Sequence, residues 1–410
     1  MACEREFQIA VLLTFVIFWT SMFVLTHCPF QDFLDHSLST LQFNHINAIT
    51  ITITSPLFLL HHPLSHTTTT TTFASTMVHS NPPLMHHYGE LVRNSGEPKK
   101  AKTFNLQNHP ACDLPLIDLA ALTSSNETEK KACTAAICKA ASEWGFFQVV
   151  NHGISHELLR KMRSEQVKLF EVPFEKKITC GLLNNPYRWG TPTATRSSHF
   201  SWSEAFHIPL TMISEAASWG EFTSLREAIN EFAAAMLEVS RLLASILAQN
   251  LGYPKDAVEK LCDAGTCFLR LNHYPCCPKS KDEIFGLVPH TDSDFLTILY
   301  QDQVGGLQLM KDSKWVAVKP NPDALIVNIG DLFQAWSNDE YKSVEHKVVA
   351  NDKMERYSVA YFLCPSNNTV INCCKGPSVY RKFTFGEYRH QIQEDVKKIG
   401  HKIGLSRFKL

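Results

Sequence analysis

The sequence predicts an α+β protein in which a jelly-roll core is flanked by helices and preceded by a mixed N-terminal subdomain. Three observations carry this prediction. Apolar residues recur with helical spacing between about residues 126 and 251, the spacing changes to two after Cys267, and helical spacing returns from Thr384. The region of period two holds consecutive short strands, which indicates a β-sandwich or jelly roll and not a parallel α/β sheet.

Length and charge limit the classes of function. The chain has 410 residues, of which 44% are hydrophobic, enough for one large domain or two ordinary ones. It contains 39 Lys and Arg against 40 Asp and Glu, a formal net charge of −1. Because the charge is balanced, we expect no nucleic acid and no anionic membrane surface as a partner.

The first 76 residues differ in composition from the rest. They hold five charged side chains and an apolar run at residues 9–25 that just reaches the length of a membrane helix. The run is open to three interpretations: a membrane anchor, a removable targeting segment, or an extension foreign to the working protein. We expect residues 1–112 to form a low-complexity extension, disordered or non-native. The 13 cysteines contain no CxxC pair and favour a reducing compartment, so the protein is expected to be cytoplasmic unless residues 9–25 anchor it.

Three further parts are expected downstream: an N-terminal subdomain at 113–262, the jelly roll at 263–366 and a C-terminal helical segment at 367–410. In the subdomain, Asn126 and Glu129 resemble a capping box, Ser155 is a second N-cap, and Gly252 is a helix stop. The elements expected there are strands at 114–119 and 146–150 and helices at about 126–143, 155–170 and 222–251.

The jelly roll is expected to contain eight strands, each bounded by turn residues. Their ranges are 268–274, 286–290, 295–301, 306–310, 315–318, 324–329, 344–350 and 357–363. A last helix is expected from Thr384 to about Gly400.

The pattern with the strongest chemical meaning is His290-Thr291-Asp292. Residues i and i+2 of a strand point to the same face, so His290 and Asp292 can bind one ion together. His346, on a later predicted strand, supplies a third ligand. Two histidines and one carboxylate leave one face of an octahedron open, as in non-haem Fe(II) oxygenases. We therefore take His290, Asp292 and His346 as candidate metal ligands and catalytic centre, although an isolated HxD pattern suits a structural histidine as well.

A second polar pair strengthens this interpretation. Arg356 and Ser358 also share a strand face, on a run that is otherwise apolar. A guanidinium beside a hydroxyl is suited to binding a carboxylate, and a surface charge would be out of place on such a strand. The sequence thus predicts a carboxylate site close to the metal.

These residues carry a family resemblance. His290, Asp292 and His346 with Arg356 and Ser358 resemble the metal triad and co-substrate motif of plant 2-oxoglutarate- and Fe(II)-dependent dioxygenases. The likeness covers about residues 113–408 and includes the segments 144–148 and 151–153. It implies a double-stranded β-helix, that is, a jelly roll. It also implies Fe(II), O2 and 2-oxoglutarate as cofactors, with ascorbate in support.

The resemblance also assigns two further residues. Asn272 and Tyr274 match the Asn-x-Tyr pattern of the family, which implies Tyr274 on the distal carboxylate of 2-oxoglutarate and Asn272 near its chelating end. Within the family, the sequence resembles gibberellin 2-beta-dioxygenases of the branch that acts on twenty-carbon gibberellins. The stretches that carry this likeness are 187–192, 201–207, 295–309 and 328–338. It implies an enzyme that hydroxylates, and so inactivates, a gibberellin. We also expect the protein to be a monomer.

Several alternatives stay open. A dioxygenase of the same fold acting on a flavonoid or an alkaloid would keep every metal and co-substrate residue, a zinc hydrolase would have no use for Arg356 and Ser358, and a binding module would need no metal. The substrate pocket is not readable from the sequence. Aromatic side chains could line it or belong to the core, and two arginines could bind a substrate carboxylate or lie in solvent. These candidates are Trp202, Phe206, Phe295, Tyr300, Phe333, Arg188 and Arg196.

Overall fold

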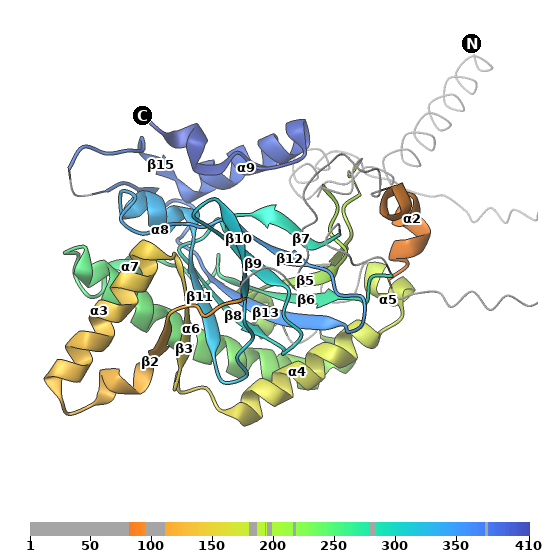
Figure 1. Cartoon of the computed structure of the whole chain (residues 1–410), viewed down its shortest axis with the longest axis horizontal. Helices are drawn as coiled ribbons and strands as arrows, with labels where there is room; N and C mark the ends of the chain where they lie inside the picture. Colours follow the sequence, from red (N-terminus) through yellow and green to blue (C-terminus); the bar gives the residue numbers. More distant parts are fainter. Residues whose placement is uncertain are drawn as a thin grey trace, which may run out of the picture. The chain divides into compact units, whose positions relative to one another are not determined.

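Two β-sheets lie at the centre of the fold (Figure 1). The computed structural model describes residues 82–94, 111–179, 187–192, 194, 199–215, 219–278, 284–373 and 376–410, all within the unit Ser75–Leu410. The five-stranded sheet has the order β1 (Ala111–Cys112), β10 (Lys314–Val318), β9 (Leu307–Lys311), β12 (His346–Val349) and β7 (Phe285–His290). The predicted apolar run at residues 9–25 lies outside the described residues.

The second sheet has eight strands. Their order is β2 (Leu116–Asp118), β3 (Phe146–Val150), β11 (Leu325–Ile329), β8 (Leu296–Gln301), β13 (Arg356–Leu363), β6 (Phe268–Tyr274), β5 (Glu204–Pro209) and β4 (Tyr187–Trp189). Apolar side chains from both sheets meet in one cluster, among them Ile326 of β11 and Leu309 of β9. The predicted jelly roll is confirmed, and all eight of its predicted strands are present within two residues of the expected ends.

The N-terminal subdomain extends the jelly roll and shares its larger sheet. β3 pairs antiparallel with β11, and β2 pairs parallel with β3. The predicted strand 114–119 is shorter than expected, because the Asp118 side chain accepts a hydrogen bond from Ala120 N and starts the 3-10 helix Leu119–Thr123. β4 and β5 were not predicted. β5 is buried on both faces and so lacks the alternation that reveals a strand.

The three long helices predicted before the jelly roll are confirmed. They are α3 (Glu127–Glu143), α4 (His156–Glu171) and α6 (Thr223–Asn250). Asn126 caps α3 by accepting from Thr128 N at 2.9 Å, and Ser155 caps α4 by accepting from Leu158 N at 3.1 Å. α6 packs on β8 and β13, while α4 packs alongside α6 (Figure 1). Together these helices cover the outer face of the larger sheet.

The remaining helices are shorter than α6. They are α2 (Leu84–Asn94), α5 (Phe174–Ile178), α7 (Ala257–Leu261), α8 (Asp331–Trp336) and α9 (Phe385–Ile399). The short strands β14 (Val370–Ile371) and β15 (Phe383–Thr384) pair with each other, and α8 and α9 contact them. α9 matches the predicted last helix: Thr384 caps it, and Gly400 ends it with φ +79°. α2 was not predicted and lies inside the expected extension 1–112, where Tyr88 packs on Phe200 with ring centroids 4.3 Å apart.

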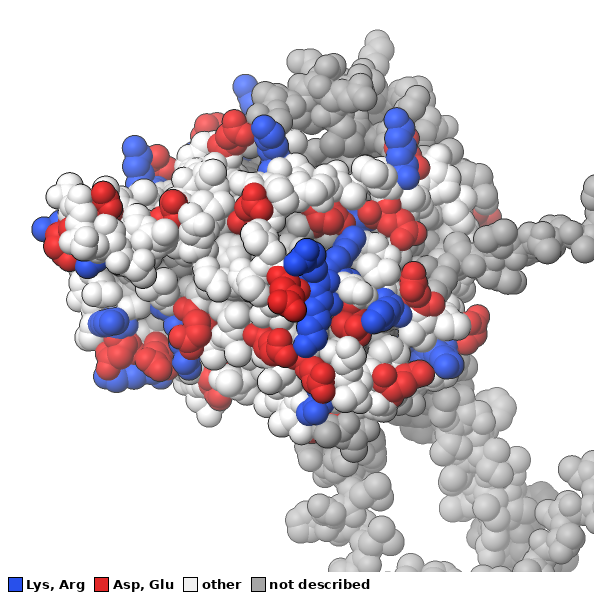
Figure 2. Space-filling view, turned by 90° about the horizontal axis from the view of Figure 1, so that it is seen from below, with Lys and Arg blue, Asp and Glu red and all other residues white. Residues whose placement is uncertain are grey.

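Two properties of the described residues concern possible partners: the distribution of surface charge and the length of the apolar helices. On the face shown in Figure 2, acidic and basic side chains are interspersed over a mostly uncharged surface, with no area of a single sign. Within the described ranges, no helix is long and apolar enough to cross a membrane.

Candidate metal centre and active site

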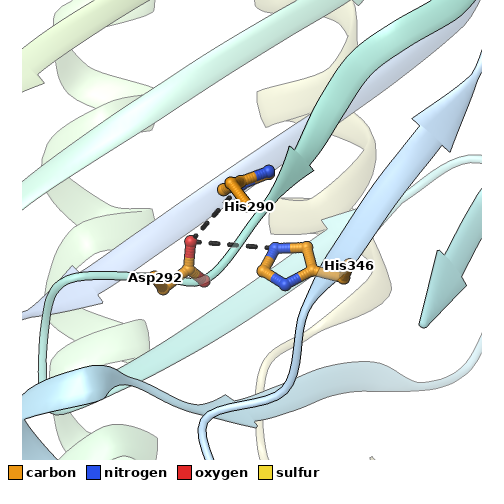
Figure 3. Close-up of side chains that lie close together, drawn as sticks. All are labelled: His290, Asp292 and His346. Atoms are coloured by element: carbon orange, nitrogen blue, oxygen red, sulfur yellow. Dashed lines mark ion pairs between the residues drawn. The ribbon is translucent and has the colours of Figure 1, made fainter. Parts of the chain in front are cut away.

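Two neighbouring strands of the smaller sheet bring the predicted metal ligands together. His290 is the last residue of β7, and His346 is the first residue of β12, directly opposite it in the antiparallel register. Asp292 follows β7 by two residues and points back at both imidazoles (Figure 3). Its Oδ1 lies 3.6 Å from Nε2 of His290 and 3.7 Å from Nε2 of His346. One ligand atom from each residue falls within 4.8 Å of the other two.

Hydrogen bonds fix both imidazoles in the tautomer that a metal requires. Nδ1 of His290 lies 2.8 Å from the carbonyl oxygen of Val288, and Nδ1 of His346 lies 3.1 Å from that of Val344. A carbonyl only accepts, so each Nδ1 donates and each Nε2 carries the free lone pair. Burial, followed by the neighbouring His346, lowers the pKa of His290. The ring is therefore neutral near pH 7 and able to bind a metal.

The carboxylate of Asp292 has one oxygen held by the protein and one free. Oδ2 accepts hydrogen bonds from Thr297 Oγ1 at 2.7 Å and from Asn328 Nδ2 at 2.8 Å. Burial opposes ionisation, but the two imidazoles and these two hydrogen bonds outweigh it and lower the pKa of Asp292. The anionic Oδ1 thus faces the same point as the two Nε2 atoms, and the donor set fits a divalent metal with three sites open.

A second carboxyl group supports this arrangement. Oδ2 of Asp294 lies 2.9 Å from Thr297 Oγ1, the hydroxyl that also donates to Asp292. Burial and the charge of Asp292 raise the pKa of Asp294 well above its ordinary value. The Thr297 hydroxyl therefore lies between the two carboxyl groups and links Asp294 to the metal ligand Asp292.

The predicted carboxylate site lies on the facing sheet. Arg356 and Ser358 sit on β13 opposite Tyr274 and Asn272 of β6 in the strand register. The guanidinium of Arg356 is 2% exposed, donates to Gln301 Oε1 at 2.7 Å and stacks with its Cζ 4.8 Å from the Tyr274 ring centroid. Its Nε has no hydrogen-bond partner among the residues that the structure describes. A buried cation with an unused donor fits a bound carboxylate, because leaving it unpaired is costly.

One residue that the sequence analysis missed holds this site in place. Gln166 of α4 is buried and donates from Nε2 to the carbonyl oxygens of Asn272 at 3.1 Å and of Ser358 at 2.9 Å. It therefore fixes the spacing of β6 and β13. No local pattern marks this glutamine, since its role depends on the docking of α4 against the sheet. Asn328, Thr297 and Gln301 were missed for the same reason.

The metal ligands and the carboxylate site line one cavity of about 1140 Å³. His290, Asp292, His346, Arg356 and Ser358 all line it, as do Asn272 and Tyr274. The five aromatic candidates for the pocket wall do not. Trp202, Phe206, Phe295 and Phe333 are buried in the core, and Tyr300 packs against it. The unexpected wall comes from α9 and the segment that follows it, including Ile392, Val396 and Ile403. Arg188 lies outside the lining, and Arg196 is not among the described residues.

A jelly roll with two histidines and an aspartate at its mouth, and a buried arginine on the opposite sheet, defines a non-haem Fe(II) oxygenase that uses 2-oxoglutarate. The chain belongs to the 2OG-Fe(II) oxygenase superfamily, whose profile matches residues 265–365. A second profile, for the N-terminal region of a non-haem dioxygenase in morphine synthesis, matches residues 114–222. The enzyme class and its cofactors, Fe(II) and 2-oxoglutarate, follow from this membership.

Curated relatives extend the similarity beyond the site. The chain is 60% identical over 304 residues to gibberellin 2-beta-dioxygenase 6 of Oryza sativa subsp. japonica, covering 72% of this chain and 85% of that protein. It is 54% identical over 297 residues to gibberellin 2-beta-dioxygenase 8 of Arabidopsis thaliana, covering 72% and 87%.

Solved structures agree on the fold. The crystal structure of JOX2 with 2OG, Fe and JA matches with a TM-score of 0.60 and 32% identity, over 74% of this chain and 91% of that one. A dioxygenase for auxin oxidation in rice matches with a TM-score of 0.60 and 26% identity, over 72% and 100%.

Proposed function

We propose that this protein is a gibberellin 2-beta-dioxygenase that acts on twenty-carbon gibberellins and thereby inactivates them. It consumes O2 and 2-oxoglutarate and releases succinate and CO2. The observation that carries the proposal is the 60% identity to the rice gibberellin 2-beta-dioxygenase over 85% of its length. The intact donor set at the mouth of the barrel supports it.

Two groups of residues in the cavity have different binding roles. We assign His290, Asp292 and His346 to the metal, and Arg356, Ser358 and Tyr274 to the distal carboxylate of 2-oxoglutarate, with Asn272 near its chelating end. When bound, Fe(II) and 2-oxoglutarate supply the O2 activation that hydroxylates an unactivated C–H bond. The protein positions both carboxylate ends of the co-substrate, holds the substrate next to the metal and limits access of water.

The substrate assignment is tested by incubating the protein with Fe(II), ascorbate, 2-oxoglutarate and a panel of acids. The panel holds twenty-carbon gibberellins, nineteen-carbon gibberellins, a flavonoid and an alkaloid acid, and products are identified by mass spectrometry. We expect a 2-beta-hydroxylated product from a twenty-carbon gibberellin. Hydroxylation of the flavonoid or the alkaloid alone would contradict the assignment of a gibberellin as substrate, but it would still agree with the proposed hydroxylation reaction.

Two further parts of the proposal concern the state of the protein in the cell. We propose a monomer located in the cytoplasm. Six of the described cysteines support the compartment, since they are free thiols: Cys133, Cys138, Cys262, Cys267, Cys276 and Cys364. Light scattering tests the first part, and fractionation of the full-length chain tests the second, with recovery in a membrane pellet favouring an anchor at residues 9–25.

A further inference from the structure

A second group of basic side chains lines the cavity, apart from Arg356. Arg270, Asn272 and Tyr274 alternate on β6, so all three face the interior. Tyr274 is opposite Arg356, whereas Arg270 lies four strand positions away, a separation of about 13 Å at 3.3 Å per residue. Asn272 lies between them. The cavity therefore has a basic group at each end and the 2-oxoglutarate site at only one.

Two other nitrogen-bearing side chains line the same cavity as Arg270. His207 is its direct partner on β5, and Arg389 reaches in from α9. Burial, followed by the charges of Arg270 and Arg389, lowers the pKa of His207 to about 4. The imidazole is thus neutral near pH 7 and stacks on Phe268 with ring centroids 4.0 Å apart. Its environment is strongly cationic.

Neither guanidinium group has a salt-bridge partner among the described residues, and the carboxylate whose charge acts on Arg270, that of Asp292, belongs to the metal site. Arg270 donates from Nε to Asn272 Oδ1 at 2.8 Å, and Arg389 donates to Asn367 Oδ1 at 3.3 Å and stacks over the Phe385 ring. Among the residues that the structure describes, neither arginine forms an ion pair. Two cations that line one cavity without a salt-bridge partner repel each other and are stabilised by a bound anion.

The helix that carries Arg389 also offers an apolar surface. Arg389, Ile392, Gln393 and Val396 line the cavity with the i, i+3, i+4, i+7 spacing of one helix face. Val396 is 46% exposed, and Ile403, which also lines the cavity, is 37% exposed. Exposed apolar side chains beside an unpaired cation suit a molecule with an apolar skeleton and a carboxylate.

We propose that Arg270 and Arg389 bind a carboxylate of the substrate, and that Ile392 and Val396 of α9 contact its apolar skeleton. The inference rests on the proposed function and deepens it, because it names the residues that select an apolar acid. The substrate carboxylate lies at the Arg270 end of β6, and the distal carboxylate of 2-oxoglutarate lies at the Arg356 end. The substrate is thereby held across the metal centre between the two.

The test compares a twenty-carbon gibberellin with its fully methylated ester, for the wild type, Arg389→Gln and Arg389→Lys. Wild type is expected to show a KM for the acid about 10- to 100-fold below that for the ester, the range of a charge-assisted hydrogen bond. In Arg389→Gln, the KM for the ester divided by the KM for the acid should fall to within threefold of unity. Arg389→Lys should keep part of the preference for the acid. The KM for 2-oxoglutarate reports separately on the Arg356 end.

Lys397→Gln is the matched control, because it removes a positive charge from the same helix at an exposed position outside the cavity lining. It should keep the wild-type ratio of the KM for the ester to the KM for the acid. An unchanged ratio in a folded Arg389→Gln protein, or a wild type that binds acid and ester equally, overturns the inference and leaves the proposed function standing. If wild type hydroxylates neither compound, the proposed function fails and the carboxylate assignment fails with it.

Discussion

Asp292 shows how single residues prepare the metal site, because its two oxygens have different partners. Oδ1 faces the histidines, while Oδ2 is held by Thr297 and Asn328. Groups that orient a metal ligand in this way contribute about 10- to 100-fold to metal affinity. His290 and Asp292 could be predicted, since HxD is a local pattern, although Asp292 lies two residues beyond β7 and not on the strand itself. His346 was predicted from a later strand and from the family resemblance. Thr297 and Asn328 could not be predicted, since they meet Asp292 only after β8 and β11 have paired.

We predict that Thr297→Val weakens Fe(II) binding by about 10- to 100-fold without unfolding the protein. The substitution preserves side-chain shape and removes the hydroxyl that donates to Asp292 at 2.7 Å. Metal titration under anaerobic conditions measures the effect, and circular dichroism checks the fold. Thr123→Val, on an exposed 3-10 turn, serves as the control. Wild-type affinity in Thr297→Val would show that Asp292 needs no such support.

Arg356 leads to a second prediction at this scale. Arg356→Lys keeps the charge but loses the planar fork that reaches Gln301 Oε1 at 2.7 Å while presenting Nε to the cavity. We expect the KM for 2-oxoglutarate to rise about 10- to 100-fold, as for loss of a charge-assisted hydrogen bond. Steady-state succinate release measures it. An unchanged KM would remove Arg356 from the co-substrate site.

At the scale of elements, the C-terminal segment fastens the loop that carries Asp292. Lys402, just after α9, donates from Nζ to the carbonyl oxygen of Thr291 at 2.6 Å, to Ser293 Oγ at 2.9 Å and to Asp331 Oδ2 at 2.8 Å. Gly330 lies against the same loop, where any Cβ would collide with Asp294. Both sides of the metal-binding loop are thus fixed by elements distant in sequence.

We predict that Lys402→Met lowers the free energy of unfolding by about 3 kcal/mol, because it leaves the buried carboxylate of Asp331 without its cation. The side chains of Lys402 and Asp331 are 15% and 4% exposed. Chemical denaturation measures the loss, and Fe(II) affinity should fall with it. Lys398→Met, at a largely exposed position of α9, should change stability by no more than about 0.5 kcal/mol. Equal effects of the two substitutions would contradict the role of Lys402.

The elements differ in how well the sequence predicts them. The strands of the jelly roll were found because turn residues bound each one. β5 was missed because it is buried on both faces, and α8, with six residues, is too short to show helical spacing. The pocket face of α9 was missed although the helix itself was predicted, because its amphipathic pattern does not say which cavity the helix borders.

At the scale of the whole molecule, a buried network links the N-terminal subdomain to the barrel. His273 of β6 lies 2.6 Å from Glu204 of β5 through Nδ1 and 3.3 Å from Glu355 through Nε2, and Lys177 of α5 donates to Glu204 at 2.7 Å. Burial opposes protonation of His273, but the two carboxylates outweigh it and raise the pKa of His273. The folded protein therefore holds this proton more tightly than the unfolded chain.

This network predicts the sign of a pH dependence. A raised pKa gives a stabilisation that is fully present below the pKa of an unfolded histidine, about 6.5, and is lost as pH rises through the folded value. We expect the difference in unfolding free energy between wild type and His273→Gln to shrink as pH increases above about 6.5. Denaturation at a series of pH values measures it. A difference that grows with pH would mean that His273 is neutral in the folded protein.

The central claim is that His290, Asp292 and His346 hold the iron of a 2-oxoglutarate-dependent gibberellin hydroxylase. Turnover of a twenty-carbon gibberellin under 18O2 tests it most directly, with wild type and Asp292→Ala side by side. The account predicts one labelled oxygen in the product hydroxyl, one in succinate, equal amounts of both products, and loss of both in Asp292→Ala. Succinate and hydroxylated gibberellin formed at the wild-type rate by Asp292→Ala, or a product oxygen derived from water, would contradict it.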